Sequence, residues 1–282
     1  GISMALSCGI IGLPMTGKTT LFNLLTGANA ETSDFFTGKT ATNNGRALVP
    51  DERVDWLAAL FKPKKTTYAQ VDVIDVPGLV RGASQGQGSG NEFLSSISNT
   101  DLLCHIVRAF ENPDILHAED TIDIMRDISI IENELLFADL QMIETRLSRI
   151  NGGNKKKMEH PHEEATLKKC QDFLMEEKPL KLLEMTEDEQ ESVRHISFLT
   201  AKPMMIVVNV DENQMSSGDY PQKEKVEAYC AGQGYELLAV CAKTEQEIAQ
   251  LPLEDREMFM EELGVSEPGV DRMAKAIYAQ LG

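Results

Sequence analysis

The chain has 282 residues, 42% of them hydrophobic, which is enough to bury a core in one large domain or in a core with an insertion. Its formal net charge is −18, from 27 basic and 45 acidic residues, and this argues against bulk DNA binding through phosphates. No run approaches the roughly 20 apolar residues of a membrane span, and the five scattered cysteines form no C-x-x-C pair. We therefore expect a cytoplasmic protein with reduced thiols and no membrane partner.

Residues 12–19 match the phosphate-binding pattern G-x-x-x-x-G-K-[ST]. An apolar run at 8–11 precedes them and another at 21–25 follows, so the context is strand, loop and helix. Glycines let successive N–H groups point at one anion, and the helix presents its positive end there. We expect Lys18 to reach the terminal phosphates of a nucleotide and the Thr19 hydroxyl to bind magnesium. The candidate nucleotide-binding residues here are Gly12, Met15, Thr16, Gly17, Lys18, Thr19 and Thr20.

A polar segment, a helix and a strand come next. Residues 26–44 are polar and broken by glycines, which predicts a mobile segment. Apolar residues at helical spacing predict a helix over 51–61, and alternation predicts a strand over 68–76 that feeds a turn. Residues 81–90, rich in Gly, Ser and Gln, have too little apolar surface to be ordered alone, so we expect a switch or lid.

A D-x-x-G pattern stands at the end of the predicted strand, in residues 75–78. Asp75 could accept water bound to magnesium, and the Gly78 N–H could reach the γ-phosphate. Since this pattern follows a phosphate loop, it indicates a nucleotide-sensing switch. The candidate catalytic residues are thus Lys18, Asp75 and Gly78.

Three further apolar runs, 101–109, 204–210 and 235–241, predict buried strands. Strands separated by helical stretches imply β-α-β crossovers, so we expect the α/β class, with a mainly parallel, P-loop GTPase-like sheet flanked by helices. Residues 120–200, between the first two of these runs, carry helical spacing broken by a polar loop. They predict an inserted antiparallel helical hairpin, a coiled-coil-like arm; the alternative is that these helices only cover one sheet face. The expected nucleotide-binding core is therefore 4–119 and 201–282.

Residues 209–212, at the end of the second of these strands, stand where guanine-specific proteins carry N-K-x-D. Val210 replaces the Lys, and Glu212, one methylene longer, replaces the Asp, so guanine selectivity should fall. The Asn209 amide carries both a donor and an acceptor and could serve the N6/N7 edge of adenine. Cys241 and Ala242 follow the last strand, where a base-supporting turn is expected.

In these motifs the chain resembles the YchF group, the Obg-like ATPases. The resemblance extends from residue 4 to residue 282. The likeness rests on 12–14, 49–53, 75–83, 90–94, 108–112, 209–212 and 267–269. The resemblance implies a GTPase-like core with a helical hairpin, preference for ATP over GTP, dependence on Mg²⁺, and association with ribosomes. It also implies that Asn209 and the Val210 backbone read adenine and that Phe110 packs near the base.

The sequence departs from the family pattern at several points. Met15 stands where the family has an Asn of the kind that binds a monovalent cation, so potassium stimulation is not expected. The switch threonine, a magnesium ligand in the family, falls on Thr40 after a one-residue shift. The family's C-terminal TGS domain is expected to be absent.

Leu79 follows the D-x-x-G pattern at the position where Ras-like switches use Gln to orient the attacking water. Because an apolar side chain cannot hold water, slow intrinsic ATP hydrolysis is expected. A GTP-specific GTPase and a nucleotide-gated binding module with negligible hydrolysis remain alternatives. A metabolic kinase is disfavoured, because no second cluster of Arg or Lys forms an acceptor lid.

Overall fold

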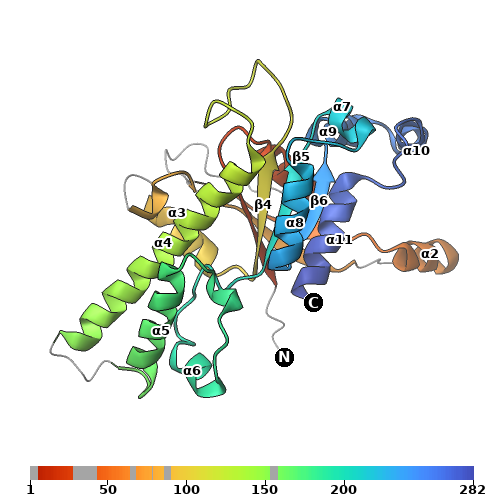
Figure 1. The fold of residues 1–282 in the computed structure, drawn as a ribbon. Helices are drawn as coiled ribbons and strands as arrows, with labels where there is room; N and C mark the ends of the chain where they lie inside the picture. The colour runs from red at the N-terminus through yellow and green to blue at the C-terminus, as the bar shows by residue number, and fades with distance from the viewer. Residues whose placement is uncertain (1–5, 28–42, 64–67, 78, 86–89, 153–157) are drawn as a thin grey trace, which may run out of the picture.

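The computed structural model describes residues 6–27, 43–63, 68–77, 79–85, 90–152 and 158–282. Its strands form a six-stranded sheet with the order β2-β3-β1-β4-β5-β6 (Figure 1). The strands are β1 (Ser7–Ile11), β2 (Asn43–Leu48), β3 (Gln70–Asp75), β4 (Leu102–Arg108), β5 (Met204–Asn209) and β6 (Glu236–Val240). Only β2 is antiparallel to its neighbour; the other pairs are parallel. This confirms the predicted α/β class and the mainly parallel sheet.

Helices cover both faces of this sheet, so β1, β4 and β5 are buried along their whole length. One apolar cluster joins the sheet to α1 (Lys18–Thr26) and α11 (Gly269–Leu281), and the other joins it to α3 (Gly90–Ser98), α4 (Ile124–Asn151) and α8 (Lys223–Gln233). The remaining helices after β5 are α7 (Glu212–Ser217), α9 (Ala242–Gln250) and α10 (Leu253–Glu262).

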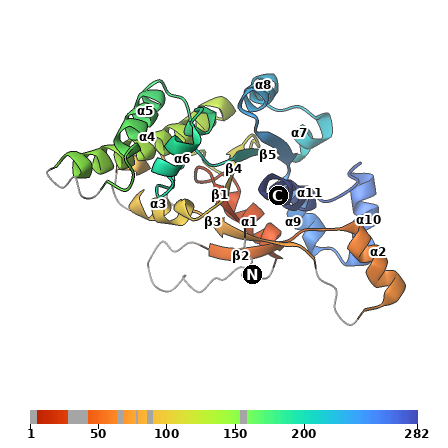
Figure 2. The same ribbon diagram turned by 90° about the horizontal axis from the view of Figure 1, so that it is seen from below.

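Helix α4 serves both the core and the predicted arm. Its first part packs on the sheet through Ile124, Ile128 and Ile131. Its later part forms a separate apolar cluster with α5 (Glu163–Met175) and with residues on both sides of α6 (Glu187–Ser192). Figure 1 shows α5 beside the projecting end of α4. Figure 2 shows this arm on one side of the molecule, with α2 (Glu52–Phe61) and α10 on the other. The inserted helices therefore form an arm, while the start of α4 also covers the sheet.

Strand β2 was not predicted, and residues 43 and 44 belong to it rather than to a mobile segment. Its sequence, Asn-Asn-Gly-Arg-Ala-Leu, lacks apolar alternation, and it is ordered by antiparallel pairing with β3, where Ala47 lies opposite Val71. Part of the predicted switch, residues 83–85, forms a 3₁₀ turn. Residues 28–42, 78, 86–89 and 153–157 lie outside the described residues, and with them the predicted sites Thr40 and Gly78.

All five cysteines are buried and unpaired, as expected for reduced thiols. In the part of the chain that the structure describes, none of the helices combines the length and the apolar character that crossing a bilayer requires.

Candidate nucleotide-binding site

The phosphate loop runs from the end of β1 to the start of α1, and its two outer glycines sit where a side chain would not fit. A Cβ at Gly12 would lie 2.6 Å from the Ile106 carbonyl oxygen. Gly17 has a φ of +82°, and a Cβ there would lie 2.3 Å from Asn209 Nδ2. The Thr16 hydroxyl donates to the Leu13 carbonyl at 2.9 Å, which closes the turn. The loop is therefore packed against β4 and β5.

Lys18, Thr19 and Asp75 meet at the carboxyl ends of the neighbouring strands β1 and β3. The Lys18 ammonium forms an ion pair with Asp75 Oδ1, and the Thr19 hydroxyl donates to Asp75 Oδ2 at 3.2 Å. Hydroxyl and carboxylate oxygens are the ligands that Mg²⁺ prefers, so Thr19 and Asp75 fit this ion. No group of three His, Cys, Asp or Glu side chains within the described ranges could hold a metal, so further ligands would have to come from elsewhere, such as nucleotide phosphates.

Asn209 braces the site from the end of β5. Its Nδ2 donates to the Thr16 carbonyl at 2.9 Å, and its Oδ1 accepts from the Ala242 N–H at 3.0 Å. The side chain is 3% exposed, so it ties the phosphate loop to the start of α9. An Asn amide has two donors and two acceptor sites, and the contacts of Asn209 with the described residues Thr16 and Ala242 use one of each. The contact of Asn209 with adenine stays a prediction.

A cavity of about 430 Å³ opens beside this brace at the carboxyl ends of β4, β5 and β6, a volume within the range of small-molecule sites. Its lining includes the predicted residues Gly17, Thr20, Phe110, Asn209, Val210, Glu212 and Ala242. Cys241 is 1% exposed and lies at the N-cap of α9. Met15 is 59% exposed on the phosphate loop. The structure thus brings these residues to one edge of the sheet.

The outer wall of the cavity is formed by the segment after β5. Glu212 begins α7 and lies 3.3 Å from the Lys243 ammonium, and this hydrogen bond raises the pKa of Lys243. Asp211 caps α7 and also accepts from the Glu111 N–H at 3.1 Å. The Val210 N–H donates to the Val240 carbonyl at 2.9 Å, so any contact between the Val210 backbone and a base falls to its carbonyl.

Arg108 is a residue of the site that the sequence analysis did not single out. It is 2% exposed, and burial lowers its pKa. Its guanidinium lies 4.2 Å from the centroid of the Phe110 ring and donates to the carbonyls of Phe110, Ile115 and, at 3.3 Å, Met15. It therefore fixes the loop after β4 against the phosphate loop. The available signal was an arginine at the end of a buried strand whose other residues are apolar apart from His105.

Leu79 is 1% exposed and belongs to the apolar cluster that contains the first part of α4. Its side chain points into the core, so it has neither the chemistry nor the position to orient a water molecule.

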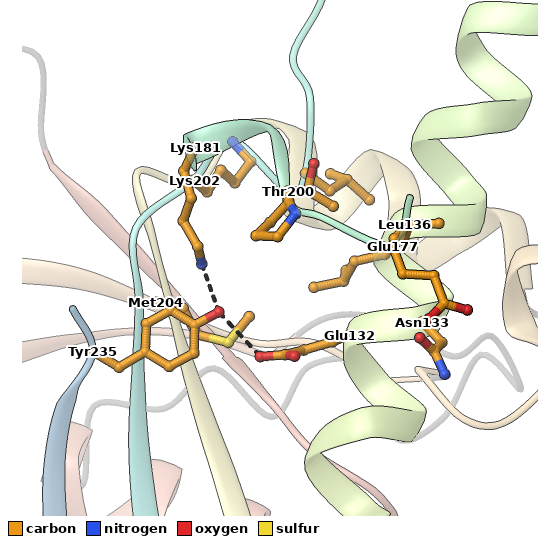
Figure 3. A pocket seen from close by; sticks show the side chains of 12 residues that line it. Glu132, Asn133, Leu136, Glu177, Lys181, Thr200, Lys202, Met204 and Tyr235 are labelled. Carbon is orange, nitrogen blue, oxygen red and sulfur yellow. Dashed lines mark hydrogen bonds between the residues drawn. The ribbon is translucent and has the colours of Figure 1, made fainter. Parts of the chain in front are cut away.

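A second cavity, of about 60 Å³, lies beside Met204, the first residue of β5, and Tyr235, which precedes β6 (Figure 3). There the Lys181 ammonium donates to the Tyr235 hydroxyl at 2.7 Å, and that hydroxyl donates to Glu132 at 3.0 Å. Burial lowers the pKa of Lys181 to about 8. This cavity lies at the amino ends of the strands, away from the phosphate loop, and is too small for a nucleotide.

Comparisons with known proteins agree with this geometry. A family model described as "50S ribosome-binding GTPase" matches residues 7–143. The "Ribosome-binding ATPase YchF" of Bacillus subtilis is 41% identical over 99% of this chain and 77% of its own length, and that of Escherichia coli O157:H7 is 39% identical over 99% and 76%. A solved structure of the Schizosaccharomyces pombe YchF GTPase superposes with a TM-score of 0.79 at 28% identity, over 98% of this chain and 75% of that one.

Proposed function

The chain belongs to the YchF family, and we propose that it is a switch that binds ATP with Mg²⁺, hydrolyses it slowly and acts at the ribosome in the cytoplasm. The observation that carries this proposal is the meeting of Lys18, Thr19 and Asp75 at the phosphate loop. Their chain neighbours Gly17 and Thr20 line the adjacent cavity together with Phe110 and Glu212. The proposed division is a nucleotide-binding core, 4–119 and 201–282, with the arm at 120–200.

In the proposed complex, the N–H groups of the phosphate loop and the Lys18 ammonium bind the phosphates and stabilise the charge that develops on them. Thr19 and Asp75, with Thr40, would hold Mg²⁺, which neutralises phosphate charge when bound. Arg108 and Asn209 keep the loop in place for this task, since both bond to loop carbonyls. The Gly78 N–H is proposed to contact the γ-phosphate.

Slow hydrolysis is proposed because Leu79 is buried in the core rather than directed at a water molecule. The same observation also supports a second function, that of a nucleotide-gated binding module that barely hydrolyses ATP. A single-turnover assay on the full chain separates the two: measurable conversion of bound ATP to ADP supports the switch, and none supports the binding module. Turnover at tens per second without a partner would contradict both.

ATP is proposed as the preferred nucleotide because Glu212 and Val210 replace the residues that read guanine in N-K-x-D proteins. The names of the relatives include both ATPase and GTPase, so the preference has to be measured. Competition titrations with ATP and GTP, with and without Mg²⁺, test it directly. Tighter binding of GTP would overturn this part of the proposal and favour a GTP-specific GTPase.

Lys18→Ala tests the site itself. It removes the ammonium that would meet the terminal phosphates, so ATP affinity should fall at least tenfold, whereas Lys225→Ala on α8 should leave it unchanged. Isothermal titration calorimetry measures both. Undiminished ATP binding by Lys18→Ala would refute the assignment of the site.

Ribosome association is proposed because the relatives in Bacillus subtilis and Escherichia coli O157:H7 are named ribosome-binding ATPases. In a chain of net charge −18, contact with ribosomal RNA has to be local, and the lysines at 155–157 are the candidate contact. Lys155→Glu with Lys156→Glu should weaken co-sedimentation with ribosomes. The charge-matched pair Lys223→Glu with Lys225→Glu, on α8, should leave it unchanged. Equal sedimentation of the two variants would exclude the 155–157 run.

A further inference from the structure

Glu134 on α4 holds the backbone of the chain that follows Asp75. Its Oε1 accepts from the Gly82 N–H at 2.7 Å, and its Oε2 accepts from the Ser84 N–H at 2.9 Å and the Ser84 hydroxyl at 2.5 Å. The side chain is only 5% exposed. A buried carboxylate needs such donors, because water cannot replace them without the site opening. The three donors named all come from one short segment.

Apolar contacts bind the same segment to α4. Leu79 is 1% exposed and Ala83 is 4% exposed, and both belong to the cluster that contains Ile128 and Ile131 of α4. The segment starts just after Asp75, which contacts Lys18 and Thr19. The chain therefore leads from Asp75 in the candidate phosphate site to residues 79–84, whose own contacts reach α4.

Helix α4 continues from Glu134 into the arm without interruption. It ends at Asn151, 17 residues farther along (151 − 134), or about 25 Å at 1.5 Å per residue. In this part Ile143 and Ile150 pack in the arm cluster with Leu167 of α5. A shift of α4 at Glu134 would consequently be carried to the end of the arm.

We infer that Glu134 is a positioning residue that couples the segment after Asp75 to the arm, so that a nucleotide-dependent change in this segment moves α4. The physical reason is that the segment cannot separate from α4 without leaving the buried Glu134 carboxylate without its donors from Gly82 and Ser84. The segment and α4 therefore move as one body. The same contacts hold the backbone of residues 79–84 in place next to the site of hydrolysis. This inference rests on the proposed nucleotide switch and adds the residue through which it acts.

Asp139 offers a matched control on the same helix. It is fully buried and accepts from the Leu199 N–H at 2.9 Å, the Thr200 N–H at 2.9 Å and the Thr200 hydroxyl at 2.7 Å, so it also has three donors. Those donors precede β5 and do not belong to the segment after Asp75. Glu134→Gln and Asp139→Asn both replace a carboxylate by an amide of nearly equal size, and each turns one acceptor oxygen into a donor.

The experiment places spin labels on Ser148→Cys in the arm and Glu224→Cys on α8, both exposed, in the full chain, whose five native cysteines are buried. Pulsed electron paramagnetic resonance measures the label distance with ADP and with a non-hydrolysable ATP analogue. We expect the distance to change with nucleotide in the otherwise unaltered chain and in Asp139→Asn. In Glu134→Gln the change should be lost. Single-turnover ATP hydrolysis should also fall at least tenfold in Glu134→Gln, with ATP affinity within twofold of the unaltered chain.

The inference would be overturned if Glu134→Gln gave the same results as Asp139→Asn in both measurements. It would also be overturned if the label distance did not change with nucleotide in a chain that binds ATP. Failure of the unaltered chain to bind ATP would refute the proposed function first, and the inference with it. Should Glu134→Gln not fold, Ser84→Ala replaces it, because it removes only the hydroxyl bond to the carboxylate. A reduced nucleotide response in Ser84→Ala supports the inference, and a full response overturns it.

Discussion

Replacing His105 with leucine should remove part of the acid sensitivity of the fold. His105 lies in β4 between Ile11 and Ile206 of the neighbouring strands and is 1% exposed. Among the described residues, neither ring nitrogen has a hydrogen-bond partner, and burial lowers its pKa from 6.5 to about 3. The folded state therefore keeps this imidazole neutral at a pH where the unfolded chain protonates it.

The sign follows from proton binding. Between pH 6.5 and about 3 the unfolded state binds one more proton at His105, so the free energy of unfolding falls as the pH falls. At pH 5, which is 1.5 units below 6.5, the loss relative to pH 8 is about 2 kcal/mol, at about 1.4 kcal/mol per unit. His105→Leu removes this contribution. It also removes two unpaired polar atoms, so the variant should be at least as stable as the unaltered chain at pH 8.

Urea unfolding of both proteins at pH 8 and pH 5 measures the effect. The stability difference between His105→Leu and the unaltered chain should grow by about 2 kcal/mol in favour of the variant at pH 5. Asp139 acts in the opposite direction, because burial raises its pKa to about 6 and its contribution falls as the pH rises from 3.8 to 6. Since both proteins contain Asp139, it cancels in the comparison. A difference that is the same at both pH values would refute the reasoning.

Three further substitutions test the contacts that build and surround the site. Asn209→Ala leaves a phosphate-loop carbonyl and the first N–H of α9 without their partner, so the free energy of unfolding should fall by about 1–3 kcal/mol per group. ATP binding should weaken at least tenfold, and an unaltered affinity by calorimetry would contradict the role of Asn209 as a brace. Arg108→Lys keeps the charge but not the planar donor set, so ATP affinity should fall about tenfold, and an equal dissociation constant would show that the arginine has no positioning role. Tyr235→Phe removes the hydroxyl between Lys181 and Glu132, so thermal unfolding should show a loss of about 1–3 kcal/mol in stability. ATP affinity should stay the same, because the cavity beside Tyr235 lies at the amino ends of the strands and the phosphate loop lies at their carboxyl ends.

Several features of the site follow from patterns of neighbouring residues. The phosphate loop, its lysine and its hydroxyl lie within residues 12–19, so their spacing alone predicted a strand, a loop and a helix, which are β1, the loop and α1. The buried strands β4 and β5 were predicted for the same reason, because both are short segments in which most residues are apolar. The sequence also predicted Asp75 at the end of a strand, although the distance from Asp75 to Thr19 required the pairing of β1 with β3.

Other features depended on contacts between residues far apart in the chain. Strand β2 has no apolar alternation and forms because β3 offers it a free edge. Asn209 reaches the loop across 193 residues, and Glu134 reaches Ser84 across 50, so no local pattern could assign their partners. Local propensity determines which elements form, whereas strand order determines which buried polar groups meet. The sequence alone therefore predicted the chemistry of phosphate binding, and the tertiary structure decided how that site is braced and joined to the arm.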